Sequence, residues 1–316
     1  MRMLTHFRKK GTLEEAETCF RGIPERLKNV LHYSAMMKIY VRWTRAREVE
    51  TYFEQIVGMT SDSKTLNYAY STILNFYAKR SDVARAEKIR ERMEARPGFL
   101  PDTHTCNALM DVYVNAKDLE RAKRLYAWME AKKIRANEIT LNTLLRAYAR
   151  AGDAEGAETV LRRVEALDGD ALALNYAYNT ILSMYATTGD SAKALVVLQR
   201  MESVAVNDLQ LNHAYSSVLS LYAKKGDVAG AREVQKRMEA REGFRPNTET
   251  WNALMSVYAY AGDVRGAEKV LERMMDAKGI EANAITYSTL MQAYASQGDV
   301  RGAEKVLERM MDAKGI

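Results

Sequence analysis

Residues 285–310 read ITYSTLMQAYASQGDVRGAEKVLERM, two apolar stripes separated by a single Gly-Asp pair. The second stripe has the i, i+3, i+4, i+7 spacing of an amphipathic helix, and the first is also helical in pattern. Their residues are Ile285, Tyr287, Leu290, Met291 and Tyr294, and then Ala303, Val306, Leu307 and Met310. Gly298 can adopt the left-handed conformation that ends a helix, and Asp299 can accept hydrogen bonds from the N–H groups that open the next one. The segment therefore predicts two helices joined by a tight turn.

The same pattern recurs along the whole chain. Short strings that end in an aromatic residue occur nine times, at Phe7, Tyr40, Tyr77, Tyr113, Tyr148, Tyr185, Tyr222, Tyr258 and Tyr294. These anchor aromatics lie 33 to 37 residues apart. Gly-Asp stands between the two stripes at 152–153, 189–190, 226–227, 262–263 and 298–299, whereas Ser81-Asp82 and Lys117-Asp118 keep only the Asp. Two amphipathic helices cannot bury both apolar faces alone, so neighbouring pairs must stack. We predict an all-α solenoid, a right-handed superhelix of about nine helix-turn-helix repeats of about 36 residues.

The repeats run from the first residue to the last, which predicts a single array over 1–316. The expected limits are an incomplete first repeat at 1–29, full repeats at 30–66, 67–102, 103–137, 138–174, 175–211, 212–247 and 248–283, and a truncated last repeat at 284–316. Residues 262–280 and 298–316 are identical, which indicates either a unit duplication or an incompletely assigned end. We expect the chain to be a fragment of a longer array, because neither end has a polar capping helix.

Composition excludes several classes of protein. Hydrophobic residues make up 47% of the chain, which excludes wholesale disorder. The two cysteines lie too far apart for a Cys-x-x-Cys zinc site, and no apolar run is long enough to span a membrane. The four histidines are scattered, and no phosphate-binding glycine loop occurs. We therefore expect no enzymatic activity, no metal or cofactor and no small-molecule substrate. The net charge of +6 permits a nucleic-acid partner without requiring one.

Residues 137–158, NEITLNTLLRAYARAGDAEGAE, resemble the pentatricopeptide repeat motif, and residues 99–102 and 244–247 look like its repeat ending. The resemblance covers the full chain in nine copies. It implies selective binding of single-stranded RNA in mitochondria or plastids, with one base read by each repeat.

In that family a polar residue six positions before the anchor aromatic reads the base. Here this first reading position holds only serine or asparagine: Ser34, Ser71, Asn107, Asn142, Asn179, Ser216, Asn252 and Ser288. The alternative interpretation is a small polar residue that is tolerated in a crowded first turn. The second reading position ends each repeat and is occupied by Asp102, Asn137, Asn247 and Asn283.

The three repeats that end at Leu66, Leu174 and Leu211 depart from this ending and share Leu-Asn-x-Ala-Tyr. Their anchor spacing is 37 residues, so the connector is shifted and the base code cannot be read there. For the regular repeats the resemblance implies G for Ser71 with Asp102 and A for Ser216 with Asn247. It implies pyrimidines for the two repeats that pair Asn with Asn.

The residue three before the first reading position packs against the base in this family. The candidates for base stacking are Tyr68, His104, Ile139, Tyr176, His213 and Ile285. Leu31 and Glu249 occupy the same position, and the carboxylate of Glu249 fits it poorly because it repels phosphate. The alternative for this position is ordinary packing between repeats.

A cation follows the anchor aromatic by two positions in five repeats, at Lys9, Arg42, Lys79, Arg150 and Lys224. One cation per repeat could follow a phosphate backbone. The alternative is a solvated helix end, which favours cations through the helix dipole.

The function predicted first is a non-enzymatic RNA-binding protein of an organelle, mitochondrion or alternatively plastid, that acts on transcript stability, processing or translation. Its partner would be single-stranded RNA, either mRNA or rRNA. A second hypothesis is a structural subunit of a mitochondrial ribosome or another large ribonucleoprotein, which binds rRNA and ribosomal proteins. A third is a protein-binding scaffold. We expect no membrane partner.

Overall fold

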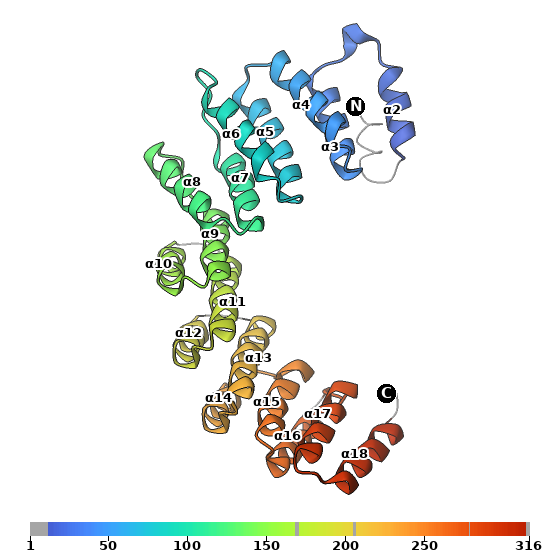
Figure 1. Ribbon diagram of the computed structural model, residues 1–316, viewed down its shortest axis with the longest axis vertical. Coiled ribbons are helices and arrows are strands. Elements are labelled where there is room, and N and C mark those ends of the chain that lie inside the picture. The colour runs from blue at the N-terminus through green and yellow to red at the C-terminus, as the bar shows by residue number, and fades with distance from the viewer. Residues whose placement is uncertain (1–11, 168–170, 205–206, 278, 314–316) are drawn as a thin grey trace. The chain divides into compact units, whose positions relative to one another are not determined.

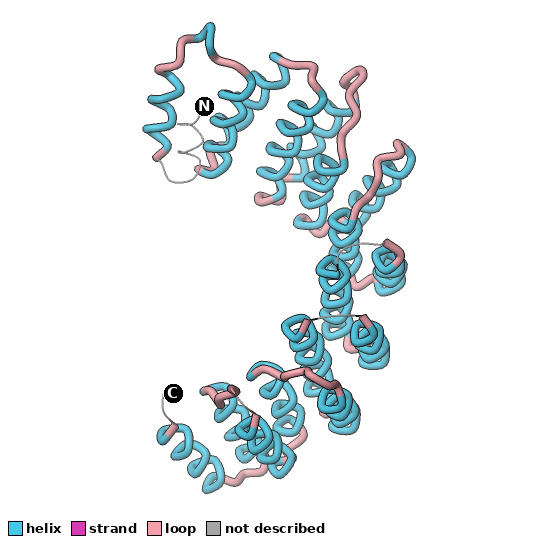
Figure 2. The backbone as a smooth tube through the Cα atoms, turned by 180° about the vertical axis from the view of Figure 1, so that it is seen from behind, coloured by secondary structure: helices cyan, strands magenta, loops and turns pink. Residues whose placement is uncertain are grey.

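The computed structural model describes residues 12–167, 171–204, 207–277 and 279–313. These residues form seventeen α-helices and one short 3-10 helix, with no strand among them (Figure 2). Among the described helices, none has the length and apolar content needed to cross a membrane. The predicted all-α solenoid is confirmed.

The chain divides into two compact units, Met1–Ala151 and Gly152–Ile316, and each is described by itself. The first unit contains α2 (Leu13–Arg21), η1 (Glu25–Leu27), α3 (Val30–Arg42), α4 (Ala46–Met59), α5 (Ser63–Ala78), α6 (Val83–Glu94), α7 (Thr103–Asn115), α8 (Leu119–Ala131) and α9 (Glu138–Ala151). The second contains α10 (Ala154–Glu165), α11 (Ala171–Thr188), α12 (Ser191–Ser203), α13 (Asp208–Lys225), α14 (Val228–Ala240), α15 (Thr248–Tyr260), α16 (Val264–Asp276), α17 (Ala284–Ser296) and α18 (Val300–Asp312).

Within each unit the helices form two layers (Figure 1). We call α3, α5, α7 and α9, and α11, α13, α15 and α17, the first helices. Each of them packs against the next first helix along its unit. The second helices between them, such as α6 and α14, contact the first helices on either side rather than one another. The reading positions predicted from the sequence all lie on the first helices or at their amino ends.

The Gly-Asp pairs form the predicted turns. Their glycines have φ between 65° and 80°, and each following aspartate caps the next helix through a bond from the N–H three residues on. Ser81 and Lys117 adopt the same left-handed conformation, with φ of 53° and 60°, although each carries a Cβ. That conformation costs a non-glycine residue about 1–2 kcal/mol.

Lys117→Gly is therefore expected to raise the free energy of unfolding by about 1 kcal/mol. Gly262 stands 145 residues further on at the equivalent turn, with φ of 69°, and Gly262→Ala is expected to lower stability by a similar amount. Urea unfolding of both variants measures the two changes. A lower urea midpoint for Lys117→Gly would show that the lysine side chain stabilises the fold by more than the left-handed backbone conformation destabilises it.

The anchor tyrosines connect neighbouring repeats through hydrogen bonds. Five of them donate the phenol O–H to a glutamate on the preceding second helix: Tyr40 to Glu17 (3.1 Å), Tyr77 to Glu50 (2.8 Å), Tyr113 to Glu87 (2.5 Å), Tyr185 to Glu158 (2.9 Å) and Tyr294 to Glu268 (2.8 Å). The sequence predicted core packing for these rings. It did not predict the carboxylate partners, which stand directly after a buried residue of each second helix.

Three first helices, α5, α11 and α13, begin earlier than the others: each starts eight residues before its first reading position, whereas α7 and α15 start four residues before theirs. The caps of α7 and α15 are Asp102 and Asn247, five residues before the first reading position. The caps of α5 and α13 are Asp62 and Asn207, nine residues before it, so these helices have one extra turn. They start before the repeat limits expected at residues 66 and 211.

Candidate nucleic-acid interface

The first reading position lies where neighbouring first helices pack together. Its side chains are mostly covered: Ser34, Ser71, Asn107, Ser216 and Asn252 are buried, Asn142 and Asn179 are half-buried, and Ser288 is exposed. Asn107 and Asn252 are 6% and 7% exposed. A base could therefore reach only one edge of these side chains.

The second reading position coincides with the start of the next first helix. Asp102, Asn247 and Asn283 are N-caps, and the side-chain oxygen of each accepts the N–H of a threonine three residues later. Asn137 makes the same bond to the N–H of Thr140 at 3.0 Å. Asp102 and Asn283 are exposed, while Asn137 and Asn247 are half-buried.

The two predicted reading positions meet in the repeats that carry two asparagines. Asn107 Nδ2 donates to Asn137 Oδ1 at 3.2 Å, and Asn252 Nδ2 donates to Asn283 Oδ1 at 3.3 Å. A buried threonine hydroxyl completes each pair, because Thr140 donates to Asn107 Oδ1 at 2.7 Å. The side chains are thus held at a fixed distance from one another.

A matching threonine supports the second asparagine pair. Thr286 Oγ1 donates to Asn252 Oδ1 at 2.8 Å. These threonines were not predicted from the sequence. Their signal is that threonine stands two residues before the first reading position in four repeats, at Thr105, Thr140, Thr250 and Thr286, each of them fully buried.

In the serine repeats the hydroxyl turns to its own helix. Ser71 Oγ donates to the carbonyl of Tyr68 and Ser216 Oγ to that of His213, both at 3.1 Å. This leaves the oxygen lone pairs as the group available to a ligand. Asp102 and Asn247 cap the next helix with the same geometry, at 2.8 Å and 2.9 Å from the threonine N–H.

The Leu-Asn-x-Ala-Tyr repeats are built differently. Leu66 and Leu211 lie inside the extended helices and are buried, so they cannot act as a second reading residue. Asn179 instead donates from Nδ2 to Gln210 Oε1 at 3.0 Å. The sequence missed Gln210 because the start of α13 was expected one turn later.

The asparagine of this motif has a structural role in two of the three repeats. Asn67 Oδ1 accepts the backbone N–H of Asp102 and the hydroxyl of Thr105, both at 2.8 Å. Asn212 Oδ1 accepts the N–H of Asn247 at 2.7 Å and the hydroxyl of Thr250 at 2.6 Å. Each asparagine thereby positions the second reading residue of the following helix.

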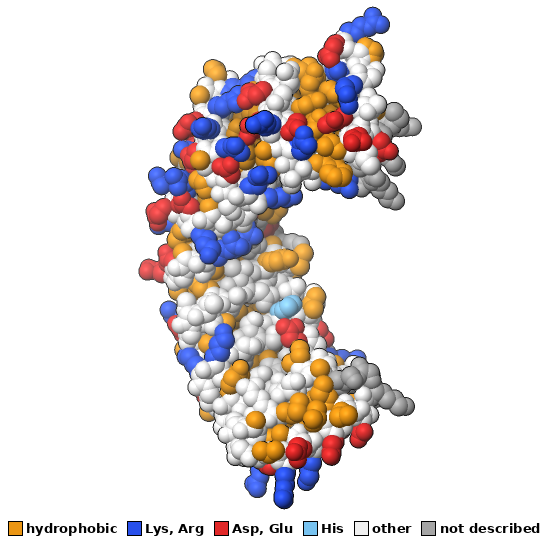
Figure 3. Space-filling view, turned by 45° about the vertical axis from the view of Figure 1, so that its right-hand side comes forward, with side chains coloured by type: hydrophobic (Ala, Val, Ile, Leu, Met, Phe, Trp, Pro, Cys, Tyr) orange, Lys and Arg blue, Asp and Glu red, His pale blue; other side chains and the backbone are white. Residues whose placement is uncertain are grey.

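The predicted stacking position is exposed throughout. Tyr68, Ile139, Tyr176 and Ile285 are 36%, 61%, 64% and 63% exposed, and His104, His213 and Glu249 are also exposed. Figure 3 looks onto part of the surface and shows a histidine close to exposed hydrophobic side chains. Lys38 Nζ lies 4.4 Å from the centre of the Tyr68 ring. Tyr68 thus contacts the neighbouring repeat through Lys38, and large apolar groups at this position are open to solvent.

The predicted phosphate contacts lie at the other end of the first helices. Arg42, Lys79, Arg150 and Lys224 are exposed near the carboxyl ends of α3, α5, α9 and α13, and Lys9 lies outside the described residues. Arg150 donates to the Val114 carbonyl at 2.8 Å, and the Arg42 guanidinium lies 5.9 Å from the Trp43 ring centre. Eight residues separate each cation from its first reading position, about 12 Å along a helix.

The surroundings of Cys106 disfavour a reactive thiol. Burial raises the pKa of the Cys106 thiol to about 12. A thiol that stays protonated at neutral pH is a poor nucleophile and a poor metal ligand. Cys106 lies on α7 in the core, where it packs as a small apolar residue.

Family models match most of the chain. A PPR repeat family model matches residues 101–150 and 246–296, and a PPR repeat model matches 68–97, 139–167, 176–204 and 285–314. A pentatricopeptide repeat domain model matches residues 205–258. The chain belongs to the pentatricopeptide repeat family.

Curated relatives match parts of this pentatricopeptide repeat chain. The mitochondrial pentatricopeptide repeat-containing protein At2g20710 of Arabidopsis thaliana is 32% identical over 39% of this chain and 24% of its own length. The chloroplastic protein At5g48730 of the same plant is 26% identical over 40% of this chain and 26% of its own length. The chain thus spans about a quarter of the length of these relatives.

Solved structures include the pentatricopeptide repeat protein PPR10 from maize. It is 22% identical, with a TM-score of 0.48 over 98% of this chain and 52% of that chain. A second PPR10 structure contains an 18-nt psaJ RNA element and is 21% identical, with a TM-score of 0.44 over 98% of this chain and 54% of that chain.

Proposed function

We propose that the chain binds single-stranded RNA through its first helices, without enzymatic activity, in the service of organelle gene expression. One observation carries the proposal: in the two repeats that carry two asparagines, the predicted reading positions are hydrogen-bonded to one another between adjacent first helices, and the side chains at the predicted stacking position are exposed. A base stacked on such a side chain gains about 1–3 kcal/mol, and the polar pair can then discriminate among bases.

The proposed location is the mitochondrion, with the plastid as the alternative. The names of the relatives support an organelle, since At2g20710 is mitochondrial and At5g48730 is chloroplastic. The proposed roles are transcript stability, processing or translation.

Two repeats form a matched pair that tests base reading within one molecule. Residues 66–113 and 211–258 align at a constant offset of 145, so Ser71 with Asp102 corresponds to Ser216 with Asn247. Aspartate only accepts hydrogen bonds, which suits the N–H edge of guanine, whereas asparagine also donates, which suits adenine. Both residues cap their helices equally well, so exchanging them changes the ligand chemistry with little effect on stability.

Asp102→Asn is therefore expected to shift the preference of its repeat from G to A, and Asn247→Asp to shift its repeat from A to G. Selection from randomised RNA measures the preference, and thermal unfolding of both variants is expected to match the unchanged chain. Loss of affinity without a change of base at either repeat would contradict base reading and assign these positions to packing.

The cations provide a second test. Lys79→Ala and Lys224→Ala are each expected to flatten the dependence of RNA affinity on salt by about 0.7 in logarithmic slope, equally for all sequences. Titrations at several salt concentrations measure the slope. A slope that is unchanged in both variants would contradict a phosphate track at the carboxyl ends of the first helices.

A structural role in a mitochondrial ribosome or another ribonucleoprotein is the second candidate. It is favoured by the extended helices α5 and α13, which place leucine where the second reading residue is expected. Sedimentation of the protein with organellar ribosomes at high salt would support this role. Release from the ribosomes at high salt would favour a free RNA-binding factor.

A further inference from the structure

A groove of about 510 Å³ opens between second helices α14 and α16, with Tyr258 of α15 also lining it. Five cationic and two acidic side chains line it: Arg232, Lys236, Arg265, Lys269 and Arg273 against Glu239 and Asp263. It is lined from the second-helix layer, whereas the predicted reading positions belong to the first helices. The predicted reading positions on the first helices, which we call the reading face, therefore do not explain the function of this groove.

Two of the cations are partly neutralised inside the groove. Arg232 lies 3.8 Å from Asp263, and Arg273 forms an ion pair with Glu239. Within the described part of the chain, Lys236, Arg265 and Lys269 form no ion pair, and all three are exposed. The groove thus presents three uncompensated positive charges.

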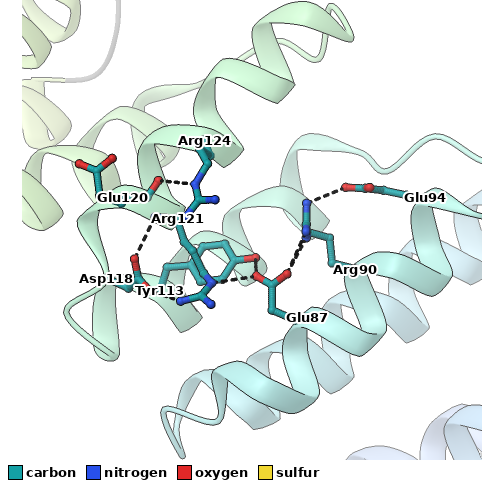
Figure 4. Close-up of polar contacts among 8 residues, drawn as sticks. All are labelled: Glu87, Arg90, Glu94, Tyr113, Asp118, Glu120, Arg121 and Arg124. Carbon is teal, nitrogen blue, oxygen red and sulfur yellow. Dashed lines mark hydrogen bonds and ion pairs between the residues drawn. The ribbon is translucent and has the colours of Figure 1, made fainter.

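The equivalent groove in the first unit supplies an internal comparison. It lies between α6 and α8, has a volume of about 280 Å³, and is lined by three cations and two carboxylates. Glu87 stands at its centre and accepts bonds from Tyr113 at 2.5 Å and Arg90 at 2.9 Å, with Arg121 at 3.5 Å (Figure 4). Arg90 and Arg121 are therefore paired with carboxylates of the first unit, whereas Arg124 donates to the backbone carbonyl of Glu120 at 3.4 Å.

At three positions the second unit has a cation where α6 or α8 of the first unit has a glutamate. Of these glutamates only Glu87 lines the α6–α8 groove, and the other lining carboxylate, Glu94, is retained as Glu239. At the offset of 145, Arg232 corresponds to Glu87, Lys236 to Glu91, and Arg265 to Glu120. Without Glu87's counterpart, the Tyr258 hydroxyl donates to the neutral Gln235 at 3.2 Å. The shared fold does not require this charge reversal, because the first unit forms the equivalent helices α6 and α8 without it.

We propose that the groove between α14 and α16 binds phosphate groups of the RNA backbone, as a second contact outside the reading face. The inference rests on the proposed RNA-binding function. Guanidinium and ammonium groups both suit phosphate oxygens, Arg265 through a fork of donors and the lysines as point charges. Beside its polar and charged side chains the lining offers only Tyr258 and Val270 as apolar surface. An acidic protein segment would lack the buried anchor that protein interfaces use.

The test is a triple variant, Lys236→Gln with Arg265→Gln and Lys269→Gln, in the full chain. It is expected to flatten the logarithmic salt slope of RNA affinity by about 2, because three phosphate contacts at about 0.7 each are lost. Base preference in a selection is expected to stay unchanged. The control is Arg90→Gln in the α6–α8 groove, whose guanidinium is already paired with Glu87 and Glu94, and it is expected to leave the slope unchanged.

The outcomes separate this inference from the proposed function. If the triple variant binds RNA with an unchanged salt slope, the proposal that the groove binds phosphate is wrong, and the proposal of base reading on the first helices still stands. Failure of the unaltered chain to bind RNA at low salt would overturn both. A polyglutamate peptide serves as the second probe: if the triple substitution abolishes its binding and leaves the RNA slope unchanged, the groove serves an acidic protein partner and the phosphate assignment is wrong.

Discussion

Asn212→Leu is expected to lower the free energy of unfolding of the second unit by about 2–6 kcal/mol. The side chain is 5% exposed and similar in volume to leucine, so the loss arises from hydrogen bonding rather than from a cavity. The substitution would leave the backbone N–H of Asn247 and the hydroxyl of Thr250 without their acceptor. Each buried polar group without a partner costs about 1–3 kcal/mol.

Asn175 is the matched control for this substitution. It occupies the same place in Leu-Asn-x-Ala-Tyr and is 3% exposed, but its Oδ1 has no hydrogen-bond partner among the described residues. Asn212 accepts the backbone N–H of the residue 35 positions later, and the equivalent residue for Asn175 is Gln210. The backbone N–H of Gln210 already donates to Asn207 Oδ1 at 3.0 Å, because α13 starts early. Asn175→Leu is therefore expected to change stability by less than about 1 kcal/mol, or to raise it.

Urea unfolding followed by the fluorescence of Trp251, which is buried next to Thr250, measures both variants. The two remaining tryptophans, Trp43 and Trp128, are replaced by phenylalanine in every chain of the series so that the signal reports the second unit. Equal losses for the two asparagine variants would contradict a specific role of Asn212 at the start of α15.

Alkaline pH is expected to destabilise both units steeply. Burial first, and then the hydrogen bond to a glutamate, raises the pKa of Tyr77, Tyr113, Tyr178, Tyr185 and Tyr215 above the range of free tyrosine. The folded state therefore holds these protons more tightly than the unfolded chain, whose tyrosines titrate near pH 10. Their contribution is complete below pH 10 and is lost as the pH rises above it.

Each tyrosine is expected to contribute about 1.4 kcal/mol of destabilisation for each pH unit above 10. Burial also raises the pKa of Tyr40, so each unit holds three such tyrosines, and each unit should lose about 4 kcal/mol by pH 11. Unfolding measured at pH 8, 10 and 11, with Trp251 and Trp128 as separate probes, tests this. Tyr185→Phe is expected to reduce the slope of the second unit by a third. The same slope with and without Tyr185 would show that other groups govern alkaline unfolding.

The solenoid could be predicted because its determinants are local. The apolar stripes at 285–310 are set by spacings of three and four residues, and Gly298-Asp299 specifies its turn through backbone preference and a cap three residues away. Repetition then requires each pair to stack on the next. The two reading positions were predicted from the family resemblance. The structure brings them together at Asn107 with Asn137 and at Asn252 with Asn283.

The sequence contains a signal for the early start of α13, but the predicted repeat limits did not include it. Asn207 belongs to the residue types that cap helices strongly, and it lies four residues before the repeat limit predicted at residue 211. Once the helix gains a turn, Leu211 is internal and Gln210 takes the place opposite Asn179.

Periodicity and capping in the amino-acid sequence by themselves determined the helix pairs, their turns and the stacked array, because those features depend on residues at most one or two turns apart. Tertiary packing alone decided the partners of the polar side chains. Tyr113 bonds Glu87 across 26 residues and Asn212 bonds Asn247 across 35. The Oδ1 of Asn175, in an identical motif, has no hydrogen-bond donor among the residues that the structure describes. A hydrogen bond needs its two atoms within about 3 Å. Such a distance between residues of different helices depends on how those helices pack, and no spacing within one helix specifies it.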